Sequence, residues 1–181
     1  KMESLLPVLR GEIPFKVHAH RADDIFTAIR IANEFNIKYV IIHATEGHLI
    51  ASYLKNEDCP VLSGPFLCDR SKPELSNLTP KSPGIMSKAG VKTAIITDHP
   101  VIPIQYLPLC AGLAIKEGMD KNEALKAITI TAAKICGIDD RVGSIEPNKD
   151  ADLVVFNDDP LTLMANPDMI LCMGNVVFKA Q

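Results

Sequence analysis

The stretch Val91-Lys92-Thr93-Ala94-Ile95-Ile96-Thr97-Asp98-His99-Pro100 decides the predicted fold. Its apolar run at residues 91–96 has the composition of a strand buried on both faces, as strands of parallel sheets are. Pro100 ends such a strand, because proline has no backbone N–H to donate to a sheet. The run therefore brings Asp98 to the carboxyl end of a buried strand, which is where α/β barrels place their chemistry.

Two earlier stretches have the same pattern and end in histidine. They are Pro14-Phe15-Lys16-Val17-His18-Ala19-His20 and Lys38-Tyr39-Val40-Ile41-Ile42-His43-Ala44. Histidine and aspartate are both common ligands of divalent metals, so the pattern predicts a metal site held by His18, His43 and Asp98. The alternatives are buried structural histidines at two strand ends and a carboxylate that caps the segment after the strand.

Composition and charge favour an ordinary globular protein. Of the 181 residues, 47% are hydrophobic and 23% are charged. The net charge of −3 gives no basic field for nucleic acid or an anionic membrane, so we expect neither as a partner. No apolar run approaches the roughly 18 residues that a membrane span needs. The five cysteines form no CxxC pair, which favours reduced thiols in a cytoplasmic protein: Cys59, Cys68, Cys110, Cys136 and Cys172.

Strand-like and helix-like segments alternate through the first 140 residues. We expect strands at residues 13–19, 39–44, 60–63 and 91–96. We expect helices at residues 2–10, 25–36 (capped by Asp23 or Asp24), 46–54, 85–89 and 103–117, and one more from Asp120 to Gly137, with Glu123 completing a capping box. Strands that alternate with helices indicate a parallel sheet, and four such units make half of an eight-stranded barrel.

Two further segments depart from this alternation. Residues 66–83 carry three prolines among charged residues, and we expect a long loop that is either a substrate lid or a passive surface excursion. After Asp139, short β runs at residues 152–156 and 169–178 predict a small separate β element, with a hairpin turn at Met173-Gly174-Asn175-Val176. The chain starts at Lys1 inside an expected helix, which suggests a piece of a longer protein.

Several motifs together resemble the amidohydrolase superfamily of metal-dependent hydrolases, in particular its imidazolonepropionase-like and Xaa-Pro-dipeptidase-like members. They lie in residues 14–180: Val17-His18-Ala19-His20, Ile42-His43-Ala44-Thr45-Glu46, Ile96-Thr97-Asp98, a helical stretch from Glu123 to Ala133, and Val142-Gly143-Ser144-Ile145-Glu146-Pro147-Asn148-Lys149-Asp150-Ala151-Asp152-Leu153. The last string is similar to the family's return from its barrel to a small β-sandwich domain. Asn148 stands where the family usually has glycine, a mild change because asparagine tolerates a left-handed turn.

The resemblance implies an α/β fold: the C-terminal half of a TIM-type (β/α)8 barrel, about strands 5–8, plus part of the β-sandwich domain. Residues 1–140 would be the half barrel and residues 141–181 the sandwich segment. By position, His18 resembles the strand-five metal ligand, His43 the strand-six ligand and Asp98 the strand-eight aspartate. The first-strand His-x-His pair and the strand-four ligand of the family would lie upstream of Lys1.

The implied activity is hydrolysis of a C–N bond in a cyclic amide or dipeptide-like substrate. A divalent metal, zinc in the first instance, would be the cofactor, with one or two ions in the full-length enzyme. Asp98 would be ligand and general base. His20, Arg21 and His99 are candidate substrate contacts, whereas His48 and Glu46 are expected to have no catalytic part. The competing hypothesis is a non-catalytic fragment or assembly module; homo-oligomerisation stays open.

Overall fold

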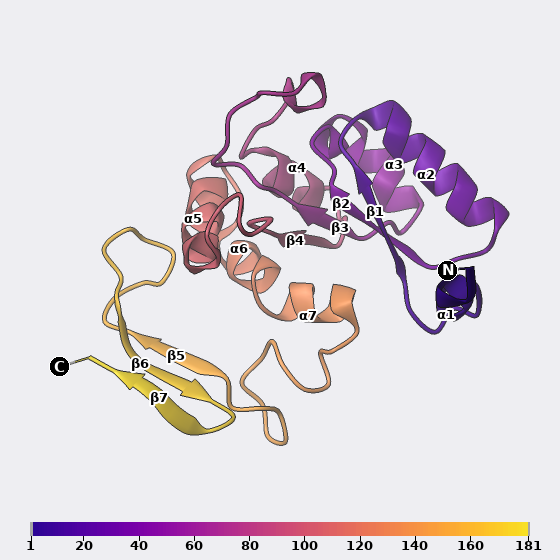
Figure 1. Ribbon diagram of the computed structural model, residues 1–181. Helices are drawn as coiled ribbons and strands as arrows, with labels where there is room; N and C mark the ends of the chain where they lie inside the picture. Colours follow the sequence, from indigo (N-terminus) through magenta and orange to yellow (C-terminus); the bar gives the residue numbers. More distant parts are fainter. Residues whose placement is uncertain (1, 181) are drawn as a thin grey trace.

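The computed structural model describes residues 2–180, which form two separate β-sheets with helices around the first (Figure 1). The first sheet is parallel, with its four strands in chain order: β1 (Phe15–Ala19), β2 (Tyr39–His43), β3 (Val61–Ser63) and β4 (Thr93–Ile95). This confirms the parallel α/β sheet expected from the alternating segments. None of the helices within residues 2–180 has the length and apolar character needed to cross a membrane.

The register of this sheet brings the carboxyl ends of its strands to one edge. Ala19 pairs with His43, His43 with Ser63, and Ser63 with Ile95. The residues that directly follow these positions therefore lie side by side at the same edge. A single row of register partners thus places chemical groups from four distant parts of the sequence together.

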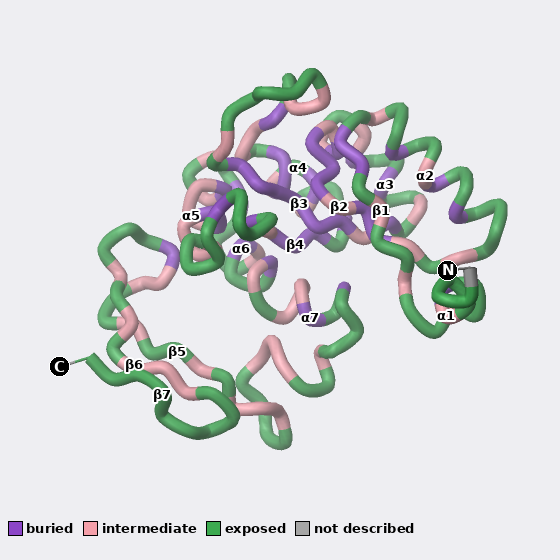
Figure 2. The backbone as a smooth tube through the Cα atoms, viewed as in Figure 1, coloured by how far each residue is buried: buried purple, intermediate pink, exposed green. Residues whose placement is uncertain are grey.

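Three helices cover one face of the parallel sheet: α2 (Ala22–Glu34), α3 (Ala51–Asn56) and α4 (Ser82–Lys88). Ile25 and Ile29 of α2 are fully buried against Ile41 of β2. Burying one such side chain stabilises the fold by about 1.5–3 kcal/mol. Figure 2 shows this buried layer running along the strands and the inner sides of the helices.

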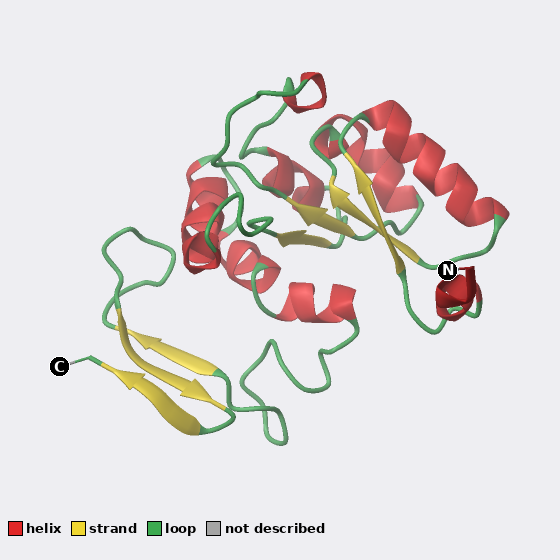
Figure 3. Cartoon of the chain, in the orientation of Figure 1, coloured by secondary structure: helices red, strands yellow, loops and turns green. Residues whose placement is uncertain are grey.

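The remaining helices pack near β4: α5 (Leu107–Lys116), α6 (Lys121–Ala127) and α7 (Ile130–Cys136). Ile135 of α7 joins Val40, Leu62 and Ala94 on the other face of the sheet. The short elements are η1 (Met2–Leu5), α1 (Leu6–Leu9), η2 (Gly47–Ile50), η3 (Pro73–Leu75) and η4 (Ile104–Tyr106). Figure 3 shows the helical and extended segments in the same view.

The sequence patterns misplace two helix features. The single helix expected from Asp120 to Gly137 is wrong: it is interrupted after Ala127, where Thr129 has φ −132° and ψ −103°. Asp120 does cap α6, since its side chain accepts from the backbone N–H groups of residues 122 and 123. The cap expected from Asp23 or Asp24 is also wrong, because α2 begins earlier, at Ala22.

The C-terminal segment forms an antiparallel sheet of β5 (Leu153–Phe156), β6 (Pro167–Cys172) and β7 (Asn175–Lys179). It shares no strand pairing with β1–β4 within residues 2–180, so the expected separate β element is confirmed. Its contacts with the first part include Leu161, which is buried with residues of α5 and α6, and Asp159, which is ion-paired with Lys121 of α6. The division into domains at residue 140 stays a prediction.

The hairpin turn expected at residues 173–176 is confirmed. Met173 and Gly174, both with positive φ, separate β6 from β7. Asn148 has φ 72°, the left-handed conformation expected at a position where the family has glycine. All five cysteines are free.

Candidate metal centre

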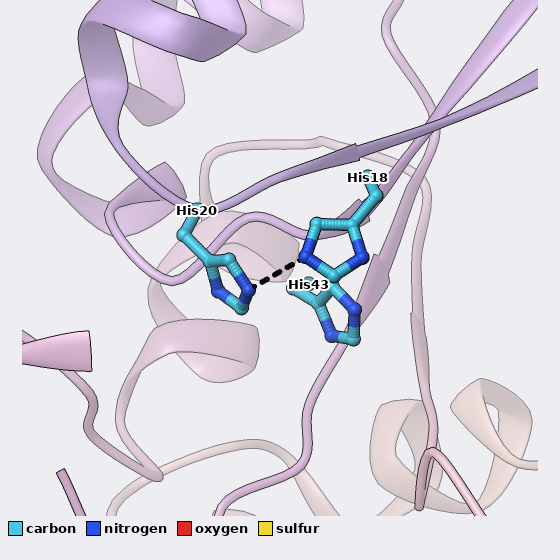
Figure 4. Close-up of side chains that lie close together, drawn as sticks. All are labelled: His18, His20 and His43. Carbon is cyan, nitrogen blue, oxygen red and sulfur yellow. Dashed lines mark hydrogen bonds between the residues drawn. The ribbon is translucent and has the colours of Figure 1, made fainter. Parts of the chain in front are cut away.

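Three histidines gather at the carboxyl edge of the parallel sheet (Figure 4). One ring nitrogen from each of His18, His20 and His43 lies within 4.8 Å of those of the other two. The Nε2 atoms of His18 and His20 are 3.0 Å apart. The rings of His20 and His43 are stacked, with centroids 4.6 Å apart and an interplanar angle of 10°.

The strand geometry explains why these side chains meet. Side chains alternate between the two faces of a strand, so His18 and His20 project to the same side, although His20 lies one residue past the end of β1. His43 is the last residue of the neighbouring strand and pairs with Ala19. It has φ 75°, and Ala44 has φ 45°, so the chain turns sharply there. The backbone N–H of Ala44 donates to the carbonyl of Ala19 at 2.9 Å and fastens the turn to β1.

Each of the two more buried imidazoles is oriented through its Nδ1 atom. The Nδ1 atom of His43 is 2.7 Å from the carbonyl oxygen of Gly64, so it carries the proton and donates. The Nδ1 atom of His20 is 2.7 Å from the hydroxyl oxygen of Thr45, which is 4% exposed. Such bonds fix the ring and leave Nε2 as the free nitrogen, the usual arrangement of metal-binding histidines.

Gly64 is required by close backbone packing. It has φ +135°, and a Cβ atom added there would lie 2.2 Å from the carbonyl oxygen of Ile96. The same two strand ends are joined by a 2.9 Å hydrogen bond from the Ile96 N–H to the Ser63 carbonyl. The acceptor for His43 is thus held by the contact between β3 and β4.

The electrostatic environment favours neutral imidazoles. Burial, with the neighbouring His43 and His18 rings, lowers the pKa of His20 to about 4. Burial also lowers the pKa of His43, although its bond to Gly64 acts in the opposite direction. A neutral imidazole is the form that binds a metal. The three residues could therefore bind a divalent metal, and an all-nitrogen donor set suits a borderline ion.

Asp98 lies at the same edge but not within the histidine cluster. It is exposed, has φ 50°, and follows β4 by three residues. Burial lowers the pKa of His43, and the charge of Asp98 opposes part of that lowering. The described residues that offer mutually close ligand atoms are the three histidines and do not include Asp98. Its role as ligand and base stays a prediction.

The two other predicted substrate contacts, Arg21 and His99, are both exposed. Arg21 is exposed and donates to Asp23 through Nε at 2.9 Å and Nη2 at 3.1 Å, so it is already paired with a carboxylate. His99 is exposed beside Asp98. The sequence analysis did not identify Thr45 and Gly64 as the residues that orient the imidazoles of His20 and His43. Neither has a local sequence signal, because each acts on a histidine at least 21 residues away.

The sequence profile described as the amidohydrolase family matches residues 10–177. This chain belongs to the amidohydrolase family. An amidohydrolase from Thermotoga maritima MSB8 superposes with a TM-score of 0.96 at 44% identity, over 99% of this chain and 47% of that chain. The family resemblance inferred from the sequence motifs is therefore confirmed.

Two curated relatives agree with this membership. Amidohydrolase tasK of Hapsidospora irregularis is 28% identical over 182 residues, which is 97% of this chain and 18% of that protein. An imidazolonepropionase of Geobacillus kaustophilus is 49% identical over 72 residues, which is 38% of this chain and 17% of that protein. The chain thus spans less than half the length of these family members.

Proposed function

We propose that this chain is the C-terminal half of a metal-dependent hydrolase that cleaves a C–N bond in a cyclic amide or dipeptide-like substrate. In this proposal β1–β4 are about strands 5–8 of an eight-stranded barrel. The observation that carries it is the convergence of His18, His20 and His43 at the carboxyl edge of the parallel sheet of an amidohydrolase-family chain. The substrate class is supported by the imidazolonepropionase relatives.

The donor set supports zinc as the metal. His18 and His43 would hold the ion, and Asp98 would approach from the end of β4. His20, held by Thr45 and facing His18, would contact substrate beside the ion. A divalent metal supplies a Lewis acid that polarises a carbonyl and makes water nucleophilic near neutral pH. One or two ions would be bound in the complete enzyme.

The protein side of the mechanism depends on a carboxylate at the strand edge. Asp98 would take a proton from the attacking water and later deliver it to the leaving nitrogen, so that the C–N bond breaks to give a carboxylic acid and an amine. Its exposed position after β4 would allow it to reach both groups. Of the two other candidates, His99 stays a possible substrate contact, whereas the pairing of Arg21 with Asp23 argues against it as a carboxylate receptor.

The test is metal-supplemented hydrolysis of a panel of cyclic amides and dipeptides. We expect the 181-residue chain to be inactive, and a longer protein that completes the barrel to be active. Half a barrel leaves the site open to water, which weakens the electrostatic interactions on which catalysis depends. Activity in neither protein, with no metal bound by either, would instead support a non-catalytic assembly module.

The proposal also includes the cellular compartment, the kind of substrate and the bound metal. Five free thiols fit a cytoplasmic protein, and a small molecule would be the only substrate. Zinc content by elemental analysis of the purified chain tests the cofactor independently of turnover. Less than about one tenth of an equivalent after loading with excess zinc would contradict the histidine site.

A further inference from the structure

Glu46 joins three segments of the chain beside the histidine site. Its carboxylate accepts a hydrogen bond from the backbone N–H of Ala22 at 2.8 Å and another from the side-chain amide of Asn77 at 2.8 Å. Its own backbone N–H donates to the carbonyl of His20 at 2.9 Å. The residue is half-buried, and these bonds lower the pKa of its carboxyl group, chiefly through the bond from Ala22. Glu46 is therefore ionised, and both of its carboxylate oxygens accept hydrogen bonds. Its position in the sequence predicts a solvent-facing residue instead.

The first of these bonds caps a helix from a distance. Ala22 is the first residue of α2, and the residue before the helix provides no side-chain cap. The N-terminal N–H groups of a helix lack internal partners, and a carboxylate there is also favoured by the helix dipole. Glu46 thereby fixes the start of α2, which directly follows His20 and Arg21.

The second bond holds the long loop between β3 and α4, residues 64–81. Apart from the turn bond from the Ser82 N–H to the Thr79 carbonyl at the start of α4, the Asn77–Glu46 bond is the only hydrogen bond or ion pair among the described residues that joins residues 65–80 to a residue outside the loop. Arg70 donates to the carbonyl of Leu78 at 2.7 Å, so the middle of the loop is closed on itself. Figure 1 shows this loop extending beyond the carboxyl ends of the strands.

The loop contributes Glu74 to a cavity beside the histidine site. This cavity of ≈ 480 Å³ lies along β1 and α2 and is lined by His18 and His20, by residues of α2 and by Glu74, whereas His43 and Asp98 are not part of its lining. Glu74 lies in the short helix η3 and Asn77 follows two residues after its end, so the bond of Asn77 to Glu46, together with the buried side chain of Leu78, ties this part of the loop to the body of the protein.

We propose that Glu46 is a positioning residue that holds the β3–α4 loop against the histidine site through Asn77, so that the loop forms one wall of the substrate cavity. When the Asn77–Glu46 bond breaks, the β3–α4 loop can move away from the histidine site. The use of the cavity for substrate rests on the proposed function. The attachment of the loop through Asn77 does not rest on the proposed function, and its test needs neither metal nor substrate.

The experiment compares the wild-type chain with Asn77→Asp, Asn77→Ala, Glu46→Ala and the reciprocal pair Glu46→Gln with Asn77→Asp. Asn77→Asp sets two carboxylates against each other and opens the loop. In the reciprocal pair, the new glutamine oxygen still accepts from Ala22, and its amide donates to the new carboxylate. Ser76→Ala, at an exposed neighbouring position, is the matched control.

Two measurements report on the loop: peptide-level amide hydrogen exchange of residues 66–81, and the rate of tryptic cleavage after Arg70. A hydrogen bond to a charged group leads us to expect both rates to rise roughly tenfold in Asn77→Asp and several-fold in Asn77→Ala. The reciprocal pair should return to within about threefold of wild type, and Ser76→Ala should not change. In every Asn77 variant the Ala22 amide should keep its protection, whereas Glu46→Ala should lose it.

Two results would overturn the proposal. One is an unchanged rate of exchange and cleavage in Asn77→Asp. The other is a reciprocal pair whose loop stays as open as that of Asn77→Asp alone, because a general structural disturbance would not be reversed by restoring one bond. Absence of hydrolytic activity or of metal binding would count against the proposed function and would leave these rates as they are.

Discussion

Replacing Gly64 by alanine should destabilise the fold and disturb the histidine site together. The new Cβ would lie 2.2 Å from the Ile96 carbonyl oxygen, about 0.8 Å inside the 3.0 Å below which such contacts do not occur. Moving β3 and β4 apart by that distance costs about 1–3 kcal/mol as overpacking. The φ of +135° adds about 1–3 kcal/mol for a residue other than glycine. We expect a loss of about 2–6 kcal/mol from a typical stability of about 5–15 kcal/mol.

Gly118→Ala provides the matched control for this prediction. Gly118 has φ +101°, but an added Cβ there would meet nothing within 4 Å, so it carries the backbone cost without the collision. Urea denaturation of both variants, followed by circular dichroism, gives the two free energies of unfolding. Zinc titration of both reports on His43, whose Nδ1 atom bonds the Gly64 carbonyl. A Gly64→Ala variant no less stable than Gly118→Ala, with unchanged zinc affinity, would refute the reasoning.

Three further outcomes follow from the site. Thr45→Val leaves the buried Nδ1 of His20 without its partner; we expect a loss of about 1–3 kcal/mol in unfolding free energy, measured by urea denaturation. Asp98→Asn in a longer protein with a complete barrel should remove most turnover of the preferred amide, since an amide side chain cannot accept the proton; full activity would exclude Asp98 as the base. Because burial lowers the pKa of His20 to about 4, and that of His43 and His48 below the usual 6.5, the unfolded chain binds more protons than the folded one between those values. The unfolding free energy of the metal-free chain should therefore fall as the pH drops from 6.5 toward about 4, and a urea midpoint that stays constant across this range would contradict the assignment of neutral folded histidines.

The parallel sheet could be predicted because β2 and β4 lie in largely apolar runs that stop at polar residues, although β1 carries Lys16 and His18. The run before Asp98 and the run ending at His43 needed no tertiary information. The alternation of side chains also placed His20 on the side of His18, which the structure bears out. The sequence pattern does not give the distances between side chains. It grouped Asp98 with His18 and His43, whereas the third member of the close cluster is His20.

The missed features depend on contacts between distant parts of the chain. The apolar spacing after Asp120 continues at helical period across the break at Thr129, so periodicity predicts one helix where there are two. The helical spacing predicts Leu125 on the buried face of that single helix, but the residue is 42% exposed. The cap of α2 comes from Glu46, 24 residues away, and no local motif can reveal a partner at that separation.

The free side of β1 has a practical consequence for handling this chain. β1 pairs with β2 along one side, and within residues 2–180 no strand pairs with its other side. Its five residues therefore present unpaired backbone groups next to the exposed apolar side chains of Ile13 and Phe15. Such an edge is a template for addition of another strand, and Lys16 is the single charge within it that opposes this. Overproduced alone at high concentration, the chain should accumulate as β-rich aggregates, and a second lysine at Phe15 should improve its yield in the supernatant.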